Sequence, residues 1–194
     1  MVMLVIGLLI FLLPHSLSFI APEWKRSKSE SLGSLFKATY AIISIIGLVL
    51  VVYGYSQTRT HPVFVWNPPA FMSLITAVLL LFAMVLLVAA YIPGNRIKTA
   101  VGHPMLVATK VWGFAHLLSN GRLGDMVLFA TLMIWSVVLY RKLKKQDRLQ
   151  PATQSTSGSA VIPTTITVIA GVGLWVFFAM WLHLRLIGVA PFGA

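Results

Sequence analysis

The chain contains no cysteine and few acidic residues. Without cysteine, disulfide bonds, thiolate catalysis, iron–sulfur clusters and zinc–thiolate sites are excluded, and histidine is the main side chain left to bind a transition metal. The four acids, Glu23, Glu30, Asp125 and Asp147, are scattered along the sequence. Chemistry that needs two carboxylates in one cleft, as in glycosidases and aspartic proteases, is therefore poorly supported.

The signatures of several enzyme and transporter classes are also missing. The chain has no G-x-S-x-G, no Walker loop, no H-E-x-x-H and no G-x-G-x-x-G. The sequence therefore contains no nucleotide-binding motif that could drive primary transport. Secondary transport stays open, although the two halves of the chain show no inverted-repeat signal.

Apolar sequence is abundant: 58% of the residues are hydrophobic, 10% are charged and the mean hydropathy is +0.90. This balance predicts an integral membrane protein. In a soluble protein the formal net charge of +11 would suggest a nucleic-acid partner. Here the positive residues cluster in short loops between apolar segments, so we expect membrane lipids, anionic ones above all, as partners and no nucleic acid.

Six apolar segments predict an all-α, polytopic membrane helix bundle with six transmembrane helices. Most have the roughly 20 apolar residues that a helix needs to cross a bilayer, and the fourth is shorter and more polar. We expect one membrane domain over residues 1–194, with a flexible cytoplasmic linker at about 149–162. The predicted spans are approximately Met1–Ala21, Leu35–Tyr55, Pro69–Ile92, Pro104 to just before Asn120, Leu123–Tyr140 and Pro163–Ala190.

The positive residues predict the orientation of these spans. The loops after the first, third and fifth spans carry Lys25, Arg26, Lys28, Arg96, Lys98, Arg141, Lys142, Lys144, Lys145 and Arg148. The alternate loops carry only Arg59 and Arg122. Because positively charged loops are retained in the cytoplasm, both termini are expected on the non-cytoplasmic side.

The stretch from Gly102 to Gly121 contains the residues on which the functional interpretation mainly depends. Proline is well suited to the first turn of a helix and Asn-Gly commonly ends one, so a helix is predicted from Pro104 to just before Asn120. At 100° per residue, Lys110 lies above His103 on the side of this helix that faces away from His116.

The other face of the same helix has the composition of a pocket. His116 shares it with Trp112, Gly113 and Thr109. Gly113 removes a side chain where a flat ligand could lie against the backbone, at a helix-propensity cost of about 1 kcal/mol relative to alanine. Small residues also serve plain helix packing in membranes, so a ligand pocket and a packing face both stay open.

Histidines at membrane depth are candidates for function, since each must find a partner or face a cavity. His15, His116 and His183 qualify. The chemistry that these residues favour is a b-type haem held by two imidazoles between helices. His15 with His116 is one possible pair and His116 with His183 is the other. The simpler role is an interhelical hydrogen bond for His15 and an interfacial position for His183.

Four parts of the sequence resemble the NnrU family of bacterial inner-membrane proteins, which are associated with denitrification and nitric oxide metabolism. They are Gly102-His103-Pro104-Met105-Leu106, the run Lys110-Val111-Trp112-Gly113-Phe114-Ala115-His116-Leu117-Leu118-Ser119-Asn120-Gly121, His15, and the segment from His183 to Pro191. The resemblance covers most of the chain. It implies a multi-pass protein of the bacterial inner membrane, with components of the nitric oxide reduction system as partners.

The same family is similar to zeta-carotene isomerase, a membrane protein that contains haem b. The shared pattern is a His-Pro and, thirteen residues after that histidine, an Ala-His, here His103-Pro104 and Ala115-His116. The similarity implies His15 and His116 as the axial pair, and it departs at Gly113, where the isomerase has a cysteine.

Two classes of function follow. In the first, the protein is a redox or ligand-sensing haem protein, or an isomerase-like enzyme, in which His15 and His116 hold the iron and Trp112, Gly113 and Thr109 shape the pocket. In the second, it is a cofactor-free accessory or assembly factor whose histidines only join helices. Whether the protein is an enzyme is left open.

Overall fold

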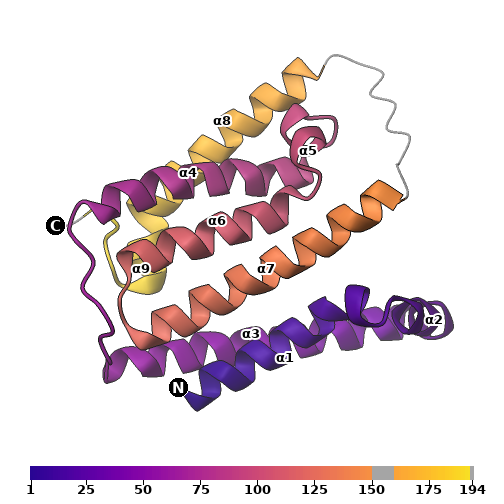
Figure 1. Cartoon of the computed structure of the whole chain (residues 1–194), viewed down its shortest axis with the longest axis horizontal. Helices are drawn as coiled ribbons and strands as arrows, with labels where there is room; N and C mark the ends of the chain where they lie inside the picture. The colour runs from indigo at the N-terminus through magenta and orange to yellow at the C-terminus, as the bar shows by residue number, and fades with distance from the viewer. Residues whose placement is uncertain (150–159, 193–194) are drawn as a thin grey trace. The chain divides into compact units, whose positions relative to one another are not determined.

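The computed structural model describes residues 1–149 and 160–192, and within them the regular elements are all helices (Figure 1). They are α1 (Val2–Ile20), α2 (Pro22–Leu32), α3 (Ser34–Thr60), α4 (Met72–Tyr91), α5 (Arg96–Val101), α6 (Pro104–Ser119), α7 (Leu123–Leu149), α8 (Val161–Phe177), the π-helix η1 (Phe178–Leu182) and α9 (His183–Ile187). The predicted all-α class is confirmed.

Among the described residues, five helical segments are long and apolar enough to cross a membrane: Val2–Ile20, Ser34–Thr60, Met72–Tyr91, Leu123–Leu149 and Val161–Ile187. The chain is therefore a multi-pass membrane protein. The remaining predicted span, α6, has 16 residues. At 1.5 Å per residue it is about 24 Å long, less than the roughly 30 Å of a bilayer core.

Several helices continue beyond the predicted spans. The basic run Arg141–Arg148, predicted to lie in a loop, is part of α7, and α3 extends to Thr60. Lysine, arginine, leucine and glutamine are good helix formers, so a helix continues in water after its apolar part has ended. The predicted linker begins and ends in helix, at Leu149 and at Val161, and its residues 150–159 lie outside the described part of the chain.

The described residues belong to two compact units. Unit 1 contains Met1–Trp66 and Arg122–Thr131, and unit 2 contains Asn67–Gly121 and the chain from Leu132 onward. Helix α7 thus contributes its first turns to unit 1 and the rest to unit 2.

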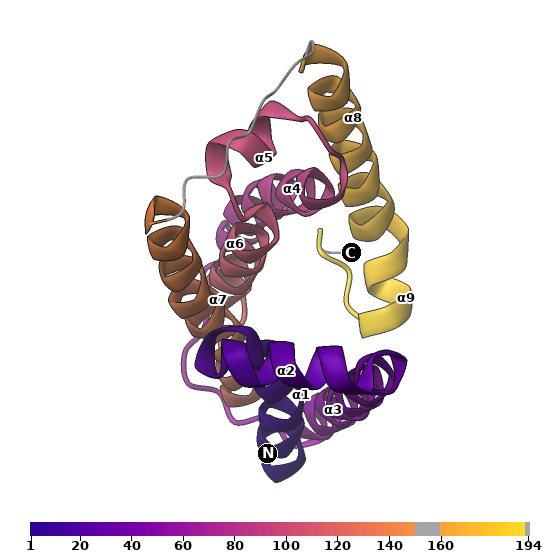
Figure 2. The same ribbon diagram turned by 90° about the vertical axis from the view of Figure 1, so that its right-hand side faces the viewer.

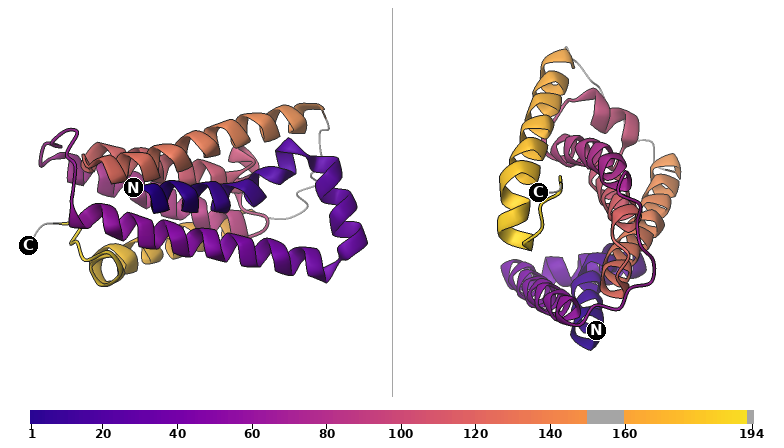
Figure 3. Two further views of the ribbon diagram at one scale, coloured as in Figure 1. Left: turned by 90° about the horizontal axis from the view of Figure 1, so that it is seen from below. Right: turned by 90° about the vertical axis from the view of Figure 1, so that its left-hand side faces the viewer.

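In unit 1, α1 and α3 run antiparallel in close backbone contact (Figure 3). A Cβ atom added to Gly7 would lie 2.5 Å from the backbone nitrogen of Val51, and one added to Gly47 would lie 2.5 Å from that of Phe11. Glycine is the only residue that permits this approach. Small residues at the contact are the usual means of packing helices in a membrane, where burial of apolar surface gives no advantage over lipid.

Helix α2 lies across the ends of α1 and α3 (Figures 2 and 3). It is polar and has no buried residue. Trp24 meets Phe36 of α3 edge to face, with ring centroids 6.4 Å apart, and Lys25 donates a 2.6 Å hydrogen bond to the Ser18 hydroxyl. Helix α2 thus combines an indole with several lysine and arginine residues, which is the composition of a helix at a membrane surface.

In unit 2, α4 packs against both α6 and α8 (Figures 1 and 2). The Thr76 hydroxyl near the start of α4 donates a 2.9 Å hydrogen bond to the Ala115 carbonyl near the end of α6, so these helices are antiparallel. On the other side, a Cβ added to Gly171 of α8 would lie 2.6 Å from the Cα of Val85 in α4.

The last helix becomes irregular toward its end. Helix α8 runs through Gly171 and Gly173 without a break and is followed by a π-helix at Phe178–Leu182. The His183 backbone N–H bonds to the carbonyl of Phe178, five residues earlier. Gly171 serves close packing against α4, and π-helical turns of this kind are frequent near functional sites.

Candidate functional site

His116 lies on α6, whose bounds, Pro104–Ser119, match the prediction. Its Nδ1 atom is 2.9 Å from the carbonyl oxygen of Trp112, one helical turn earlier. The indole and imidazole rings are 5.0 Å apart between centroids and inclined at 46°. Residues four apart lie on the same helix face, so the contact predicted from the sequence is present.

His15 on α1 has the same arrangement. Its Nδ1 atom lies 2.6 Å from the carbonyl oxygen of Phe11, and the two rings are 4.5 Å apart and inclined at 34°. A third ring, that of Tyr40 on α3, lies 5.5 Å from the imidazole. Phe11 with His15, and Trp112 with His116, are called the aromatic–histidine pairs below.

These contacts determine which ring nitrogen carries the proton. A carbonyl oxygen only accepts hydrogen bonds, so Nδ1 is the donor in both pairs. In the neutral imidazole the lone pair is then on Nε2. Metal-binding histidines commonly donate their other ring N–H to a backbone carbonyl, which fixes the tautomer and the ring orientation. Each pair therefore fits the chemistry required of an axial haem ligand.

His183, the alternative ligand, is bonded differently. Its Nδ1 atom donates to the Val189 carbonyl at 2.7 Å, a residue that follows it in the chain. Its ring meets that of Phe178 edge to face at 5.8 Å. This contact holds the C-terminal turn after α9, where Gly188 has a φ of +75°. The imidazole again presents its lone pair on Nε2.

The other predicted pocket residues lie on the expected face of α6. Gly113 is buried, and the Thr109 hydroxyl donates to the Met105 carbonyl of its own helix. Thr109, Trp112, Gly113, His116 and His183 belong to unit 2, whereas His15 belongs to unit 1. The assignment of His15 and His116 to one iron stays a prediction.

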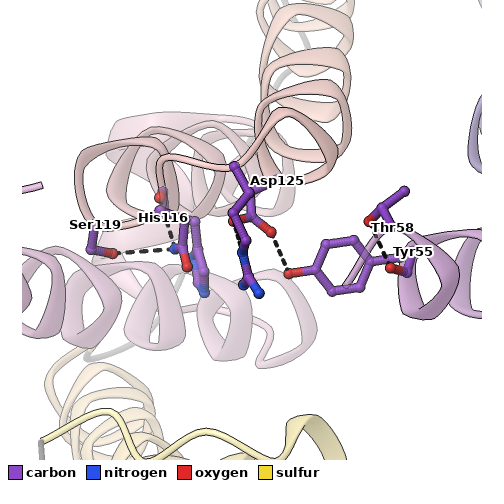
Figure 4. Close-up of polar contacts among 7 residues, drawn as sticks. Tyr55, Thr58, His116, Ser119 and Asp125 are labelled. Carbon is purple, nitrogen blue, oxygen red and sulfur yellow. Dashed lines mark hydrogen bonds and ion pairs between the residues drawn. The ribbon is translucent and has the colours of Figure 1, made fainter. Parts of the chain in front are cut away.

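A buried carboxylate that the sequence analysis did not assign lies in unit 1. Asp125, at the start of α7, is 1% exposed. Its Oδ1 accepts a 2.7 Å hydrogen bond from the Tyr55 hydroxyl, and its Oδ2 accepts one of 2.8 Å from the Nε of Arg122 (Figure 4). The feature of the sequence that could have indicated this buried carboxylate is a single acidic residue in the first turn of an apolar span.

A second polar cluster joins the start of α6 to the far end of α7, within unit 2. His103 Nε2 lies 3.0 Å from Asp147 Oδ2, and its ring meets Tyr140 edge to face. The ammonium groups of Lys110 and Lys144 lie 5.2 Å and 6.0 Å from the centroid of the same Tyr140 ring. Lys110 and His103 thus share a side of α6, as their spacing predicts.

Among residues 1–149 and 160–192, no three histidine or acidic side chains gather in the manner of a metal-binding group. This observation concerns sites made of protein ligands alone. A haem supplies four nitrogen ligands of its own and needs only one or two from the chain.

Comparison with known proteins gives one result. The model of the NnrU protein family matches residues 3–191, nearly the whole chain. Neither the curated proteins nor the solved structures that were searched yield a match. The matched range includes both aromatic–histidine pairs, the Gly102–Gly121 stretch and His183. The chain belongs to the NnrU family.

Proposed function

We propose that this protein binds haem b through its membrane histidines and serves nitric oxide metabolism in the bacterial inner membrane. His15 and His116 are the proposed axial ligands, and His183 is the alternative partner of His116. The observation that carries the proposal is the shared geometry of the aromatic–histidine pairs, in which Nδ1–H binds the carbonyl of the aromatic residue four positions earlier.

Two features of the pairs support this assignment. Each imidazole orientation is set by a hydrogen bond within its own helix, so the ligand atom Nε2 is oriented before any iron binds. Each imidazole also lies against an aromatic ring, at 4.5 Å for Phe11 and 5.0 Å for Trp112. Each ring thus provides an apolar surface beside the imidazole, of the kind that a porphyrin packs against.

A bound haem held by two imidazoles would supply electron transfer at iron. The chain itself would hold the iron through Nε2, keep the proton on Nδ1 and exclude water with Phe11, Trp112 and Tyr40. The link to nitric oxide metabolism rests on membership of the NnrU family.

We further propose that α6 crosses the membrane as a sixth span and that both termini face away from the cytoplasm. Because α4 and α6 are antiparallel and joined by the Thr76–Ala115 hydrogen bond, α6 returns through the layer that α4 crosses. The basic helices α2 and α5 and the basic end of α7 then lie on the cytoplasmic side, as the positive-inside rule requires.

The visible absorption spectrum of the purified protein, produced in cells supplied with haem, tests the haem proposal. We expect a Soret band and sharp reduced α and β bands, as two axial imidazoles give. His15→Ala and His116→Ala should each abolish the low-spin spectrum. His61→Ala, in the exposed segment after α3, is the matched control and should retain it.

The variants also distinguish the possible ligand pairs. If His183→Ala removes the low-spin spectrum and His15→Ala does not, the pair is His116 with His183. A colourless, iron-free preparation of the folded protein would overturn haem binding and favour an accessory or assembly role for the chain.

A further inference from the structure

A groove lies on unit 2 where α5 meets the first turns of α8. It has a volume of about 300 Å³ and is lined by Arg96, Val161, Thr164, Thr165, Val168 and Ile169. It belongs neither to the aromatic–histidine pairs nor to the two polar clusters described above. Figure 1 shows α5 beside the beginning of α8, and the lining residues come from these two parts of the chain.

The cationic end of the groove is held rigidly. Asn95, just before α5, is fully buried. Its side chain donates to the Ala89 carbonyl at 2.9 Å and accepts from the Lys98 backbone N–H at 2.7 Å. The Arg96 backbone N–H donates a 2.9 Å hydrogen bond to the Thr164 hydroxyl of α8. The position of Arg96 relative to α8 is therefore fixed by the backbone, while its side chain is exposed.

The groove changes character along its length. Arg96 and the two threonines form one end, and Val168 and Ile169 form the other. At 1.5 Å per residue, Ile169 lies about 12 Å further along α8 than Val161, toward the middle of the candidate membrane span Val161–Ile187. Val161, Thr165, Val168 and Ile169 share a helix face because their spacings are three, four and seven or eight residues. A groove with one polar end and one apolar end is suited to bind an amphiphilic molecule.

The charge of Arg96 is not neutralised by a carboxylate within the described residues. Three of the four acids are engaged elsewhere: Glu30 with Arg26, Asp125 with Arg122 and Asp147 with His103. The fourth, Glu23, belongs to α2 of unit 1. A guanidinium binds phosphate oxygens with two parallel hydrogen bonds, so an anionic phosphate complements this end of the groove.

We propose that this groove binds one anionic phospholipid, with its phosphate on the Arg96 guanidinium and an acyl chain along Val168 and Ile169. A free phosphate would use only the polar end, whereas a lipid also covers the apolar end. The positive charge favours an anionic lipid over a zwitterionic one. Such a lipid would bridge α5 and α8 and would be a specific ligand of unit 2.

Native mass spectrometry of the full chain from mild detergent, with added phosphatidylglycerol, phosphatidylcholine or inorganic phosphate, tests the proposal. We expect the phosphatidylglycerol adduct to be retained preferentially. Arg96→Gln should weaken it by about tenfold, the effect of losing one charged hydrogen-bonding partner. Arg148→Gln, which removes an exposed arginine at the end of α7, is the control and should leave the adduct unchanged.

A second pair of variants tests the apolar end. Ile169→Trp fills the groove and should also weaken phosphatidylglycerol binding, whereas Ile166→Trp, at an exposed position outside the lining, should not. Circular dichroism on each variant verifies that the helices are retained. The proposal is overturned if Arg96→Gln and Ile169→Trp bind phosphatidylglycerol like the wild type, if phosphatidylcholine is retained equally, or if inorganic phosphate alone displaces the lipid.

Discussion

Tyr55 donates a 2.7 Å hydrogen bond to Asp125, a residue 70 positions later in the chain. The carboxylate is almost fully buried, and Arg122 neutralises its charge. This contact joins α3 to the start of α7 in unit 1. A second contact beside it, the 2.8 Å hydrogen bond from the Leu123 N–H to the Val63 carbonyl, joins the segment after α3 to the same turn.

Asp125→Ala should lower the free energy of unfolding by about 3–5 kcal/mol, the usual cost of removing one member of a buried ion pair. The substitution leaves Arg122 without its counter-ion and the Tyr55 hydroxyl without its acceptor. Denaturant titration in detergent, followed by circular dichroism, measures the loss. Tyr55→Phe removes only the hydrogen bond and should cost about 1 kcal/mol.

Asp147→Ala provides the matched comparison. Its carboxylate binds His103 at 3.0 Å, but its side chain is 49% exposed. Exposed ion pairs contribute at most about 1 kcal/mol, so this variant should unfold close to the wild-type midpoint. If Asp125→Ala and Asp147→Ala lower the free energy of unfolding equally, burial does not determine how much these two ion pairs contribute to stability.

Two glycines of α8 should respond in opposite ways to the same substitution. In Gly171→Ala the new methyl group would lie 2.6 Å from the Val85 backbone, so α4 and α8 must separate at a cost of about 1–3 kcal/mol. At Gly173 an added Cβ meets nothing within 4 Å. Gly173→Ala should therefore be neutral or stabilise the helix by up to about 1 kcal/mol. Thermal unfolding of both variants measures the difference, and a stabilised Gly171→Ala would contradict the close approach.

The ring nitrogen that carries the proton should differ among the histidines of the haem-free protein. His15, His116 and His183 bind carbonyl oxygens through Nδ1 and should be Nδ1–H tautomers when neutral. His103 instead binds Asp147 through Nε2 and should be protonated there. Nitrogen-15 chemical shifts of histidine-labelled protein distinguish the tautomers. An Nε2–H form of His15 or His116 would remove the main support for iron binding.

Because the chain has no cysteine, single introduced cysteines can test the proposed six-span topology directly. Single cysteines at the exposed positions Ser27, Thr99 and Gln146 should react only from the cytoplasmic side. Those at Gln57, Leu123 and Val189 should react from the opposite side. Labelling of intact cells with an impermeant maleimide measures this. Thr99 and Leu123 flank α6, so labelling of both from one side would show that α6 does not cross.

Much of the fold could be predicted from local sequence. The apolar runs of α1, α4 and α8 predicted helices of membrane-spanning length, and Pro104 with Asn120 predicted both ends of α6. These features depend on hydropathy and on the chemistry of helix ends, which involve neighbouring residues only. The helical continuation at Arg141–Arg148 was missed because charge predicts exposure to water, whereas backbone propensity decides whether the helix continues.

In the candidate site, too, some contacts could be predicted from local sequence and others could not. The sequence alone determined the contact between Trp112 and His116, since a spacing of four places both on one helix face, and it determined that histidine is the principal metal ligand on offer. Only the tertiary structure decided that Tyr40 lies against His15, that Tyr55 bonds to Asp125, and that Gly171 rather than Gly173 touches α4. These contacts join residues far apart in the chain, and they depend on which helix faces meet, which hydropathy and spacing along one helix do not specify.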